Sequence, residues 1–210
     1  NERAPRRMAV LDPVKVVLTN FPEGETEWFE AANHPQKPEM GVRKVPITRE
    51  LWIERADFME DAPKKFFRLK PGGEVRLRNA FIIRCDDIKK DEAGDIAELH
   101  CSFDPETRSG LPGADRKVKG TIHWVSAEHA VEAEVRLYDR LFCVPDPAGD
   151  KERDFVEHIN PESLQVMVNA QLEPGLENAR PGEHYQFERT GYFVADPDST
   201  GDTSVFNRAV

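Results

Sequence analysis

Positive charge is concentrated between Lys64 and Arg78 in a chain that is acidic as a whole. This segment carries six basic residues and one acid, whereas the full sequence has 29 Lys+Arg against 39 Asp+Glu. Its second half alternates charged residues with Val75 and Leu77, which predicts a half-buried strand with Arg76 and Arg78 on one face. Two guanidinium groups at that spacing, roughly 6.5–7 Å apart, suit neighbouring phosphates or base edges of a nucleic acid. A solvated strand face is the competing explanation of the same alternation.

The composition is that of a globular protein with a modest core, since 39% of residues are hydrophobic and 32% are charged. No apolar run approaches the ~20 residues that a membrane span needs, so we expect no membrane partner. The net charge of −10 argues against indiscriminate binding to nucleic acid but permits specific binding by a local basic patch. Cys85, Cys101 and Cys143 lack the spacing of a disulfide framework or zinc site, which favours a reducing, cytoplasmic compartment. We interpret the polar start without methionine as the cut end of a longer protein.

The 16 Pro and 13 Gly residues divide the chain into short segments, most of which have strand character. No segment has the length of the helix in a parallel βαβ unit, so the sequence predicts an all-β fold at spacings that suit closed barrels. One short helix is expected at 57–65, with Asp57 as its N-cap. The expected strands are Val14–Thr19, Lys44–Thr48, Glu74–Cys85, Ile96–Phe103, Lys117–Val125, Ala130–Leu137, Leu164–Asn169, His184–Arg189 and Gly191–Ala195.

The sequence shows no pattern of catalytic or metal-binding residues. The six His residues lack metal-ligand spacing and a nearby acidic partner. No Gly-rich loop carries the Lys and Ser/Thr of a phosphate-binding loop, and the acidic pairs at 86–87 and 91–92 fit no calcium loop. We therefore expect no catalytic residue, no metal ion and no cofactor in this chain.

Several separate motifs occur along nearly the whole chain in a fixed order. They are Met8–Lys15, Asn33–Gly41, Lys64–Phe81, Lys117–Ser126, Arg136–Phe142, Ile159–Leu164 and Gln186–Phe193. Together they resemble the C-terminal anticodon-binding region of glutaminyl-tRNA synthetases, and the resemblance runs from about Ala4 to Val210. It implies two closed or partly closed β-barrels of the ribosomal-protein-like anticodon-binding type, with short helical connections. The first barrel would span 1–122 and the second 123–210, with room for strand exchange between them.

The resemblance also implies which residues read the second and third anticodon bases. Arg6 and Gln186 match residues at the middle base, a uracil, to whose edge an amide can donate and accept at once. Arg68 matches an arginine at the third base, a guanine, whose O6 and N7 atoms suit a guanidinium fork. Arg189 matches an arginine that supports the pocket beside Gln186.

The first, wobble base is assigned in the same way to the strand of the basic segment. Arg76 and Arg78 match an arginine pair at this base and its phosphate. Lys65 and Phe67 occupy positions where the resemblance implies polar or basic RNA contacts in the bacterial relatives. Lys65 can still bind a phosphate, whereas Phe67 can only stack or pack.

Aromatic residues near these positions have a simpler explanation. Tyr185, Phe187 and Trp124 lie in strand-like runs, so we interpret them as core residues rather than stacking platforms. Lys117 and Lys119 lie on the same face of an expected strand. The sequence does not distinguish whether they contact a backbone phosphate or only solvent.

The implied partners are the anticodon loop of tRNA(Gln) and an upstream catalytic domain of the same protein, which would bind ATP with Mg. The protein would act as a monomer. A close alternative is the anticodon-binding part of an archaeal or eukaryotic-type glutamyl-tRNA synthetase. More distant alternatives are a free-standing ribosomal-RNA-binding β-barrel protein and an all-β interaction module that binds no RNA.

Overall fold

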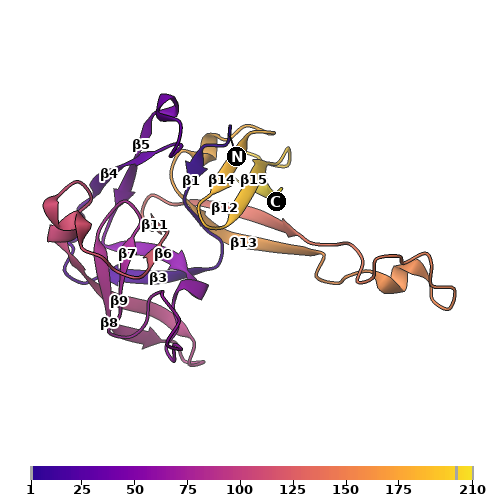
Figure 1. Ribbon diagram of the computed structural model, residues 1–210, viewed down its shortest axis with the longest axis horizontal. Coiled ribbons are helices and arrows are strands. Elements are labelled where there is room, and N and C mark those ends of the chain that lie inside the picture. The colour runs from indigo at the N-terminus through magenta and orange to yellow at the C-terminus, as the bar shows by residue number, and fades with distance from the viewer. Residues whose placement is uncertain (1, 202, 210) are drawn as a thin grey trace.

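The computed structural model describes residues 2–201 and 203–209, and within them it contains strands and short 3-10 helices but no α-helix. The strands form two seven-stranded sheets and one two-stranded hairpin. Figure 1 shows two neighbouring lobes, one for each large sheet, with the two ends of the chain close together at the second lobe. The predicted all-β fold with two nearly closed barrels is confirmed.

The first sheet has the strand order β10-β7-β8-β9-β3-β6-β11. Its strands are β3 (Pro13–Leu18), β6 (Glu50–Glu54), β7 (Glu74–Leu77), β8 (Ile82–Lys90), β9 (Ile96–Asp104), β10 (Thr121–Ile122) and β11 (Trp124–Ser126). Alternate residues of β3 and β7 are buried, as expected of strands with one face on a core. The hairpin β4 (Glu27–Ala32) and β5 (Val42–Ile47) contributes Phe29, Val45 and Ile47 to the same core.

The second sheet has the strand order β1-β14-β15-β16-β12-β13-β2. Its strands are β1 (Arg6–Arg7), β2 (Ala9–Val10), β12 (Val131–Tyr138), β13 (Leu164–Leu172), β14 (His184–Phe187), β15 (Gly191–Ala195) and β16 (Ser204–Arg208). The smaller core of this barrel contains Phe187, Phe193 and Phe206. Tyr185, Phe187 and Trp124 are all buried, which confirms that they are core residues.

Each sheet is almost closed into a barrel by one strand that is broken in the middle. β10 pairs with β7, and β11, on the other side of His123, pairs with β6 at the opposite edge of the sheet. Around Met8, β1 pairs with β14 and β2 pairs with β13 in the same manner. The breaks at His123 and Met8 each leave one seam of the barrel open.

The N-terminal segment belongs to both barrels. β1 and β2 precede the first barrel in the chain but complete the sheet of the second. Met8 and Val10 lie in the core of the first barrel, whereas Ala9 and Leu11 lie in the core of the second. Because full burial of a side chain such as Met8 stabilises the fold by roughly 1.5–3 kcal/mol, this segment holds the two barrels together.

The chain passes from the first large sheet to the second between β11 and β12. The expected division at 122/123 falls between β10 and β11, which both belong to the first sheet. The chain enters the second sheet only after Ser126, at β12. β1 and β2, from the start of the chain, lie in the second sheet.

The helices of the described residues are all short 3-10 turns. They are η1 (Pro38–Met40), η2 (Arg55–Asp57), η3 (Pro105–Thr107), η4 (Pro112–Asp115), η5 (Phe155–His158) and η6 (Leu176–Asn178). The helix predicted at 57–65 is wrong. Asp57 ends η2 and is buried, Phe58 forms a bridge to Leu69, and Pro63 removes a donor that a helix would need.

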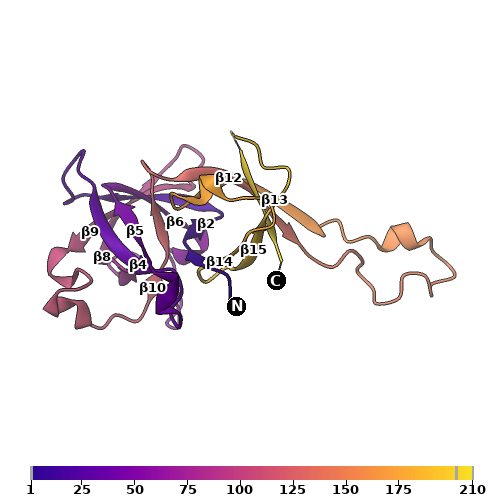
Figure 2. The same cartoon turned by 90° about the horizontal axis from the view of Figure 1, so that it is seen from above.

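A long arm connects β12 and β13. Residues 139–163 extend away from both barrels in Figures 1 and 2, and η5 lies toward the far tip of this arm. Phe155 is 54% exposed and Val156 is 49% exposed. No helix in the described part of the chain is both long and apolar enough to cross a membrane.

Candidate nucleic-acid interface

Arg6 and Gln186 lie side by side although 180 positions separate them in the sequence. β1 runs parallel to β14, with Arg6 directly opposite Gln186. The Arg6 Nε atom donates a hydrogen bond of 3.2 Å to Gln186 Oε1. The N-terminal segment and a late strand of the chain therefore meet in the second barrel. The hydrogen bond from Arg6 also fixes the orientation of the Gln186 amide, because the amide oxygen must face the Arg6 guanidinium.

Arg189 lies three residues further on and is held by a buried carboxylate of the first barrel. Its guanidinium donates to both oxygens of Asp57, at 2.6 and 2.7 Å, and lies 3.1 Å from His123 Nδ1. The hydrogen bonds to Asp57 raise the pKa of Arg189. The backbone of Arg189 has φ +67°, a left-handed conformation that a bulky residue seldom adopts and that is often found at functional sites.

Arg68 shares Asp57 with Arg189. Its Nε atom lies 3.2 Å from Asp57 Oδ1, and its side chain is 48% exposed, whereas that of Asp57 is 3% exposed. Arg68, Arg189 and His123 line one cavity of about 290 Å³ where the two barrels meet. The structure therefore brings together two of the arginines that the sequence analysis placed in different base contacts.

Arg78 belongs to a second charged cluster between the barrels. It forms an ion pair with Glu188, which follows β14 and is 6% exposed. Glu188 also lies 3.8 Å from Arg43 of β5. Arg43 in turn donates to both oxygens of Glu173, at 2.5 and 3.0 Å.

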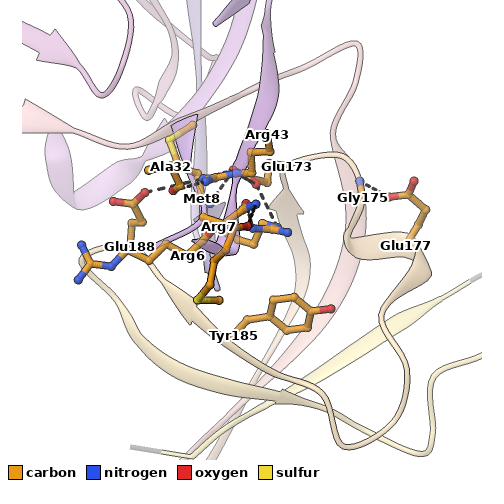
Figure 3. Close-up of polar contacts among 12 residues, drawn as sticks. Arg6, Arg7, Met8, Ala32, Arg43, Glu173, Gly175, Glu177, Tyr185 and Glu188 are labelled. Carbon is orange, nitrogen blue, oxygen red and sulfur yellow. Dashed lines mark hydrogen bonds and ion pairs between the residues drawn. The ribbon is translucent and has the colours of Figure 1, made fainter. Parts of the chain in front are cut away.

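Glu173 is the centre of this cluster, as Figure 3 shows. Its side chain is 2% exposed, and it accepts a hydrogen bond of 2.9 Å from the backbone of Met8 at the break between β1 and β2. It also lies 3.4 Å from Arg7. Burial lowers the pKa of Arg7, and the charge of Glu173 acts in the opposite direction.

Arg76 has a different environment from Arg78. Val75 and Leu77 are fully buried, so the predicted alternation of the strand is correct. The Arg76 guanidinium, however, donates to three backbone carbonyl groups, those of Thr107, Ala114 and Arg116. It fastens η3 and η4 to the barrel, and its donors point to protein oxygens.

Lys65 and Phe67 lie on the surface beside these residues. Lys65 is exposed, and Phe67 is 50% exposed. Tyr185, next to Gln186, donates a hydrogen bond of 2.8 Å to Glu183, and burial raises its pKa to about 12. Tyr185 is thus a neutral core residue.

The sequence analysis did not identify the carboxylates that hold the arginines. Asp57, Glu173 and Glu188 are all buried. Their one signal in the sequence is an acid next to a single apolar residue of a strand, as Glu173 follows Leu172 and Glu188 follows Phe187. Among the described residues, no group of three or more His, Cys, Asp or Glu is arranged to hold a metal ion.

Two family models match most of the chain. Both are described as the anticodon-binding domain of class I tRNA synthetases (E and Q), and they match residues 4–104 and 121–196. The chain belongs to this family. The first matched range ends with β9, and the second starts with β10.

Proteins of similar sequence agree with this family assignment. The chain is 57% identical to a glutamine–tRNA ligase of Vibrio parahaemolyticus, with 100% of this chain and 37% of that protein covered. It is 57% identical to one of Cupriavidus metallidurans, with 99% and 36% covered, and 53% identical to one of Rhodopirellula baltica, with 100% and 35% covered. The chain thus spans little more than a third of the length of these relatives, and it matches their C-terminal part. Neither a glutamyl-type enzyme nor a free-standing ribosomal-RNA-binding protein is favoured by these matches.

In this anticodon-binding region, Arg76→Ala is expected to loosen η3 and η4. Three carbonyl groups lose their donor, so we expect about 1–3 kcal/mol less stability and faster amide hydrogen exchange at 105–116. Hydrogen exchange and urea unfolding measure both effects. Arg84→Ala, an exposed arginine that forms an ion pair with Asp86, is the control. Loss of RNA binding with unchanged exchange would show instead that Arg76 contacts RNA directly.

Proposed function

We propose that this chain is the anticodon-binding part of a glutamine–tRNA ligase and that it reads the anticodon loop of tRNA(Gln). In the complete protein, a catalytic domain upstream would join glutamine to the tRNA with ATP and Mg, and the protein would act as a cytoplasmic monomer. The observation that carries the proposal is the Arg6–Gln186 pair, in which a guanidinium orients an amide on a strand that lies within the matched anticodon-binding domain. The arrangement supports recognition of RNA.

The pair is suited to a uracil as the middle anticodon base. Arg6 uses one of the two lone pairs of the Gln186 oxygen, so the amide keeps one acceptor site and its N–H donors beside the Arg6 guanidinium. A uracil matches this set with its O4 acceptor and N3–H donor, whereas a cytosine presents an N4 donor and an N3 acceptor. The cytosine would leave a donor unpaired, which costs roughly 1–3 kcal/mol.

The other two anticodon bases are assigned by exposure and charge. Arg68 is half exposed at the cavity between the barrels and would contact the guanine at the third position, with Arg189 in support. Arg78, with a side chain that is 33% exposed, would contact the wobble base or its phosphate. Arg76 would act indirectly by fixing η3 and η4, and Lys65 would bind a phosphate.

We predict that the chain binds an anticodon stem-loop with uracil at the middle position more tightly than one with cytosine, by roughly 1–3 kcal/mol. Arg6→Ala and Gln186→Ala should each reduce this difference. The double variant should lose less than the sum, because both side chains serve one base. Fluorescence anisotropy with the two stem-loops measures the effect, and Gln165→Ala, an exposed glutamine on β13, is the control. Equal binding of both stem-loops by the unmodified chain would overturn the assignment.

Binding should also weaken with salt although the chain carries a net charge of −10. Few phosphates are engaged by the basic segment 64–78, so the slope of log K against log salt should be shallow, on the order of two to four. A titration from low to moderate salt with the same stem-loop measures the slope. A slope near zero would favour an interaction module that binds protein.

A further inference from the structure

Unpaired positive charge gathers around one hollow of the first barrel. The hollow has a volume of about 280 Å³ and is formed by the segments 64–74 and 117–120. Its lysines are Lys64, Lys70, Lys117 and Lys119. In the part of the chain that the structure describes, these four form no salt bridge, whereas Lys15, Lys89 and Lys90 each pair with a carboxylate. In a protein with a net charge of −10, such a cluster calls for an anionic ligand.

The acid that lines the hollow does not neutralise these lysines. Glu74 accepts two hydrogen bonds from Arg116, at 3.0 and 3.2 Å. Its charge is therefore matched by a residue outside the hollow. The positive charge of the four lysines is therefore not neutralised, and an anionic ligand could bind them without first displacing a carboxylate.

The wall of the hollow is aromatic as well as basic. Phe67 is 50% exposed, and the Lys119 ammonium lies 5.3 Å from the centre of its ring. Arg68 lies in the same relation to Phe66, at 5.8 Å. A half-exposed phenylalanine next to a lysine side chain offers a flat face that a second planar group could cover.

The backbone brings the two segments of the hollow into close contact. A Cβ atom on Gly120 would lie 2.0 Å from the carbonyl oxygen of Phe67, so glycine is required for this approach. The Gly120 carbonyl also accepts a hydrogen bond of 2.9 Å from the backbone of Arg76 in β7. Phe67 is thereby held on a rigid edge of the barrel, beside Lys117 and Lys119.

We propose that this hollow binds an unpaired nucleotide of the RNA, with the base stacked on Phe67 and its phosphates held by Lys64, Lys117 and Lys119. Single-stranded nucleic acid is bound by this combination of an aromatic platform and a basic groove. Lys119 would move from the ring to a phosphate as the base arrives, which its flexible side chain permits. Every base has a flat face, so this subsite tolerates any base, unlike the Arg6–Gln186 pair.

An acidic peptide would pair with the lysines but would not stack on the Phe67 ring. A carboxylate-rich segment gains little from an exposed phenylalanine, whereas a nucleotide uses the ring and the lysines together. The proposal rests on the proposed function, since it requires that the chain binds an RNA loop. It adds a contact that is independent of the sequence of the anticodon.

The test measures binding of the glutamine anticodon stem-loop to the full 210-residue chain and its variants. Phe67→Ala and Phe67→Leu should each weaken binding about 5- to 150-fold, and Phe67→Tyr should bind like the unmodified chain. Lys117→Ala and Lys119→Ala should each lower the salt slope by about one. Phe155→Ala and Lys151→Ala are matched controls, since both are exposed residues of the distant arm. Thermal unfolding of each variant shows that it is folded.

A set of stem-loops with one loop base removed at a time locates the contact. For one position in the loop, base removal should make the unmodified chain and Phe67→Leu bind equally. The U-to-C preference at the middle base should be the same in both proteins. This preference together with unchanged binding by the Phe67 variants would overturn the subsite and leave the proposed function intact.

The remaining outcomes are also decisive. If the unmodified chain does not bind the stem-loop, the proposed function fails, and the subsite fails with it. If a glutamate-rich decapeptide binds and Lys117→Ala and Lys119→Ala weaken it while RNA binding is unaffected, the hollow is a docking site for protein. Equal weakening by Phe67→Ala and Phe155→Ala would show a general loss of apolar surface instead of stacking.

Discussion

Glu173→Ala is expected to destabilise the chain by about 3–5 kcal/mol, the usual cost of removing one partner from a buried ion pair. Its carboxylate is 2% exposed and lies against Arg7 and Arg43. Without it, two guanidinium groups, 19% and 11% exposed, remain next to each other, and the backbone N–H of Met8 loses its acceptor. The loss falls at the open seam of the second barrel, where β1 and β2 meet.

Urea unfolding measures this effect as a lower midpoint with an unchanged slope. Glu173→Gln keeps the shape and one acceptor but removes the charge, so its stability should lie between the unmodified chain and Glu173→Ala. Glu132→Ala, an exposed glutamate on β12, should change stability by about 0.5 kcal/mol or less. A Glu173→Ala variant within about 1 kcal/mol of the unmodified chain would mean that water replaces the carboxylate and that the cluster does not hold the barrels together.

Local pattern was enough to predict most of the strands. The alternation of Val75 and Leu77 with charged residues gave the buried face of β7, and the expected strand at 96–103 differs from β9 by one residue. The expected strand at 74–85 is in fact two strands, because the chain turns at Asn79, which has φ +61°. Asparagine tolerates this left-handed conformation, so the turn has a weak signal in the sequence.

Contacts between distant segments could not be predicted from local pattern. The strand expected at 117–125 is broken at His123 because its two halves pair with opposite edges of the sheet. Arg43 and Glu173 are 130 positions apart, and Asp57 and Arg189 are 132 apart. No spacing rule connects such pairs, since the fold alone brings them together.

The family resemblance supplied what periodicity did not. It placed Arg6 and Gln186 at one base, and the structure sets them opposite each other in paired strands. It treated Arg76 and Arg78 as equivalent, and the structure separates them, since Arg76 donates to backbone carbonyls and Arg78 pairs with Glu188. Which arginine has free donors depends on neighbours such as η3 and η4, which are distant from β7 in the sequence.

Asp57→Ala is expected to reduce stability by about 3–5 kcal/mol and to weaken RNA binding as well. Asp57 is 3% exposed and holds Arg189 by two hydrogen bonds and Arg68 by an ion pair. Both arginines line the cavity between the barrels, so its loss removes the support of two proposed RNA contacts at once. Urea unfolding and stem-loop binding measure the two effects, and Asp61→Ala, an exposed aspartate nearby, is the control.

The backbone of Arg189 offers a sharper form of this experiment. If Asp57 compensates both the charge and the left-handed backbone of Arg189, removing Arg189 from the Asp57→Ala variant should restore part of the lost stability, because the Arg189 guanidinium is then no longer left without its carboxylate. Arg189→Gly should restore more than Arg189→Ala, since glycine adopts φ +67° without strain. Equal stability of the two double variants would show that the conformation costs little. A further loss in both would show that Arg189 stabilises the barrel junction through contacts other than Asp57, among which His123 is the first candidate.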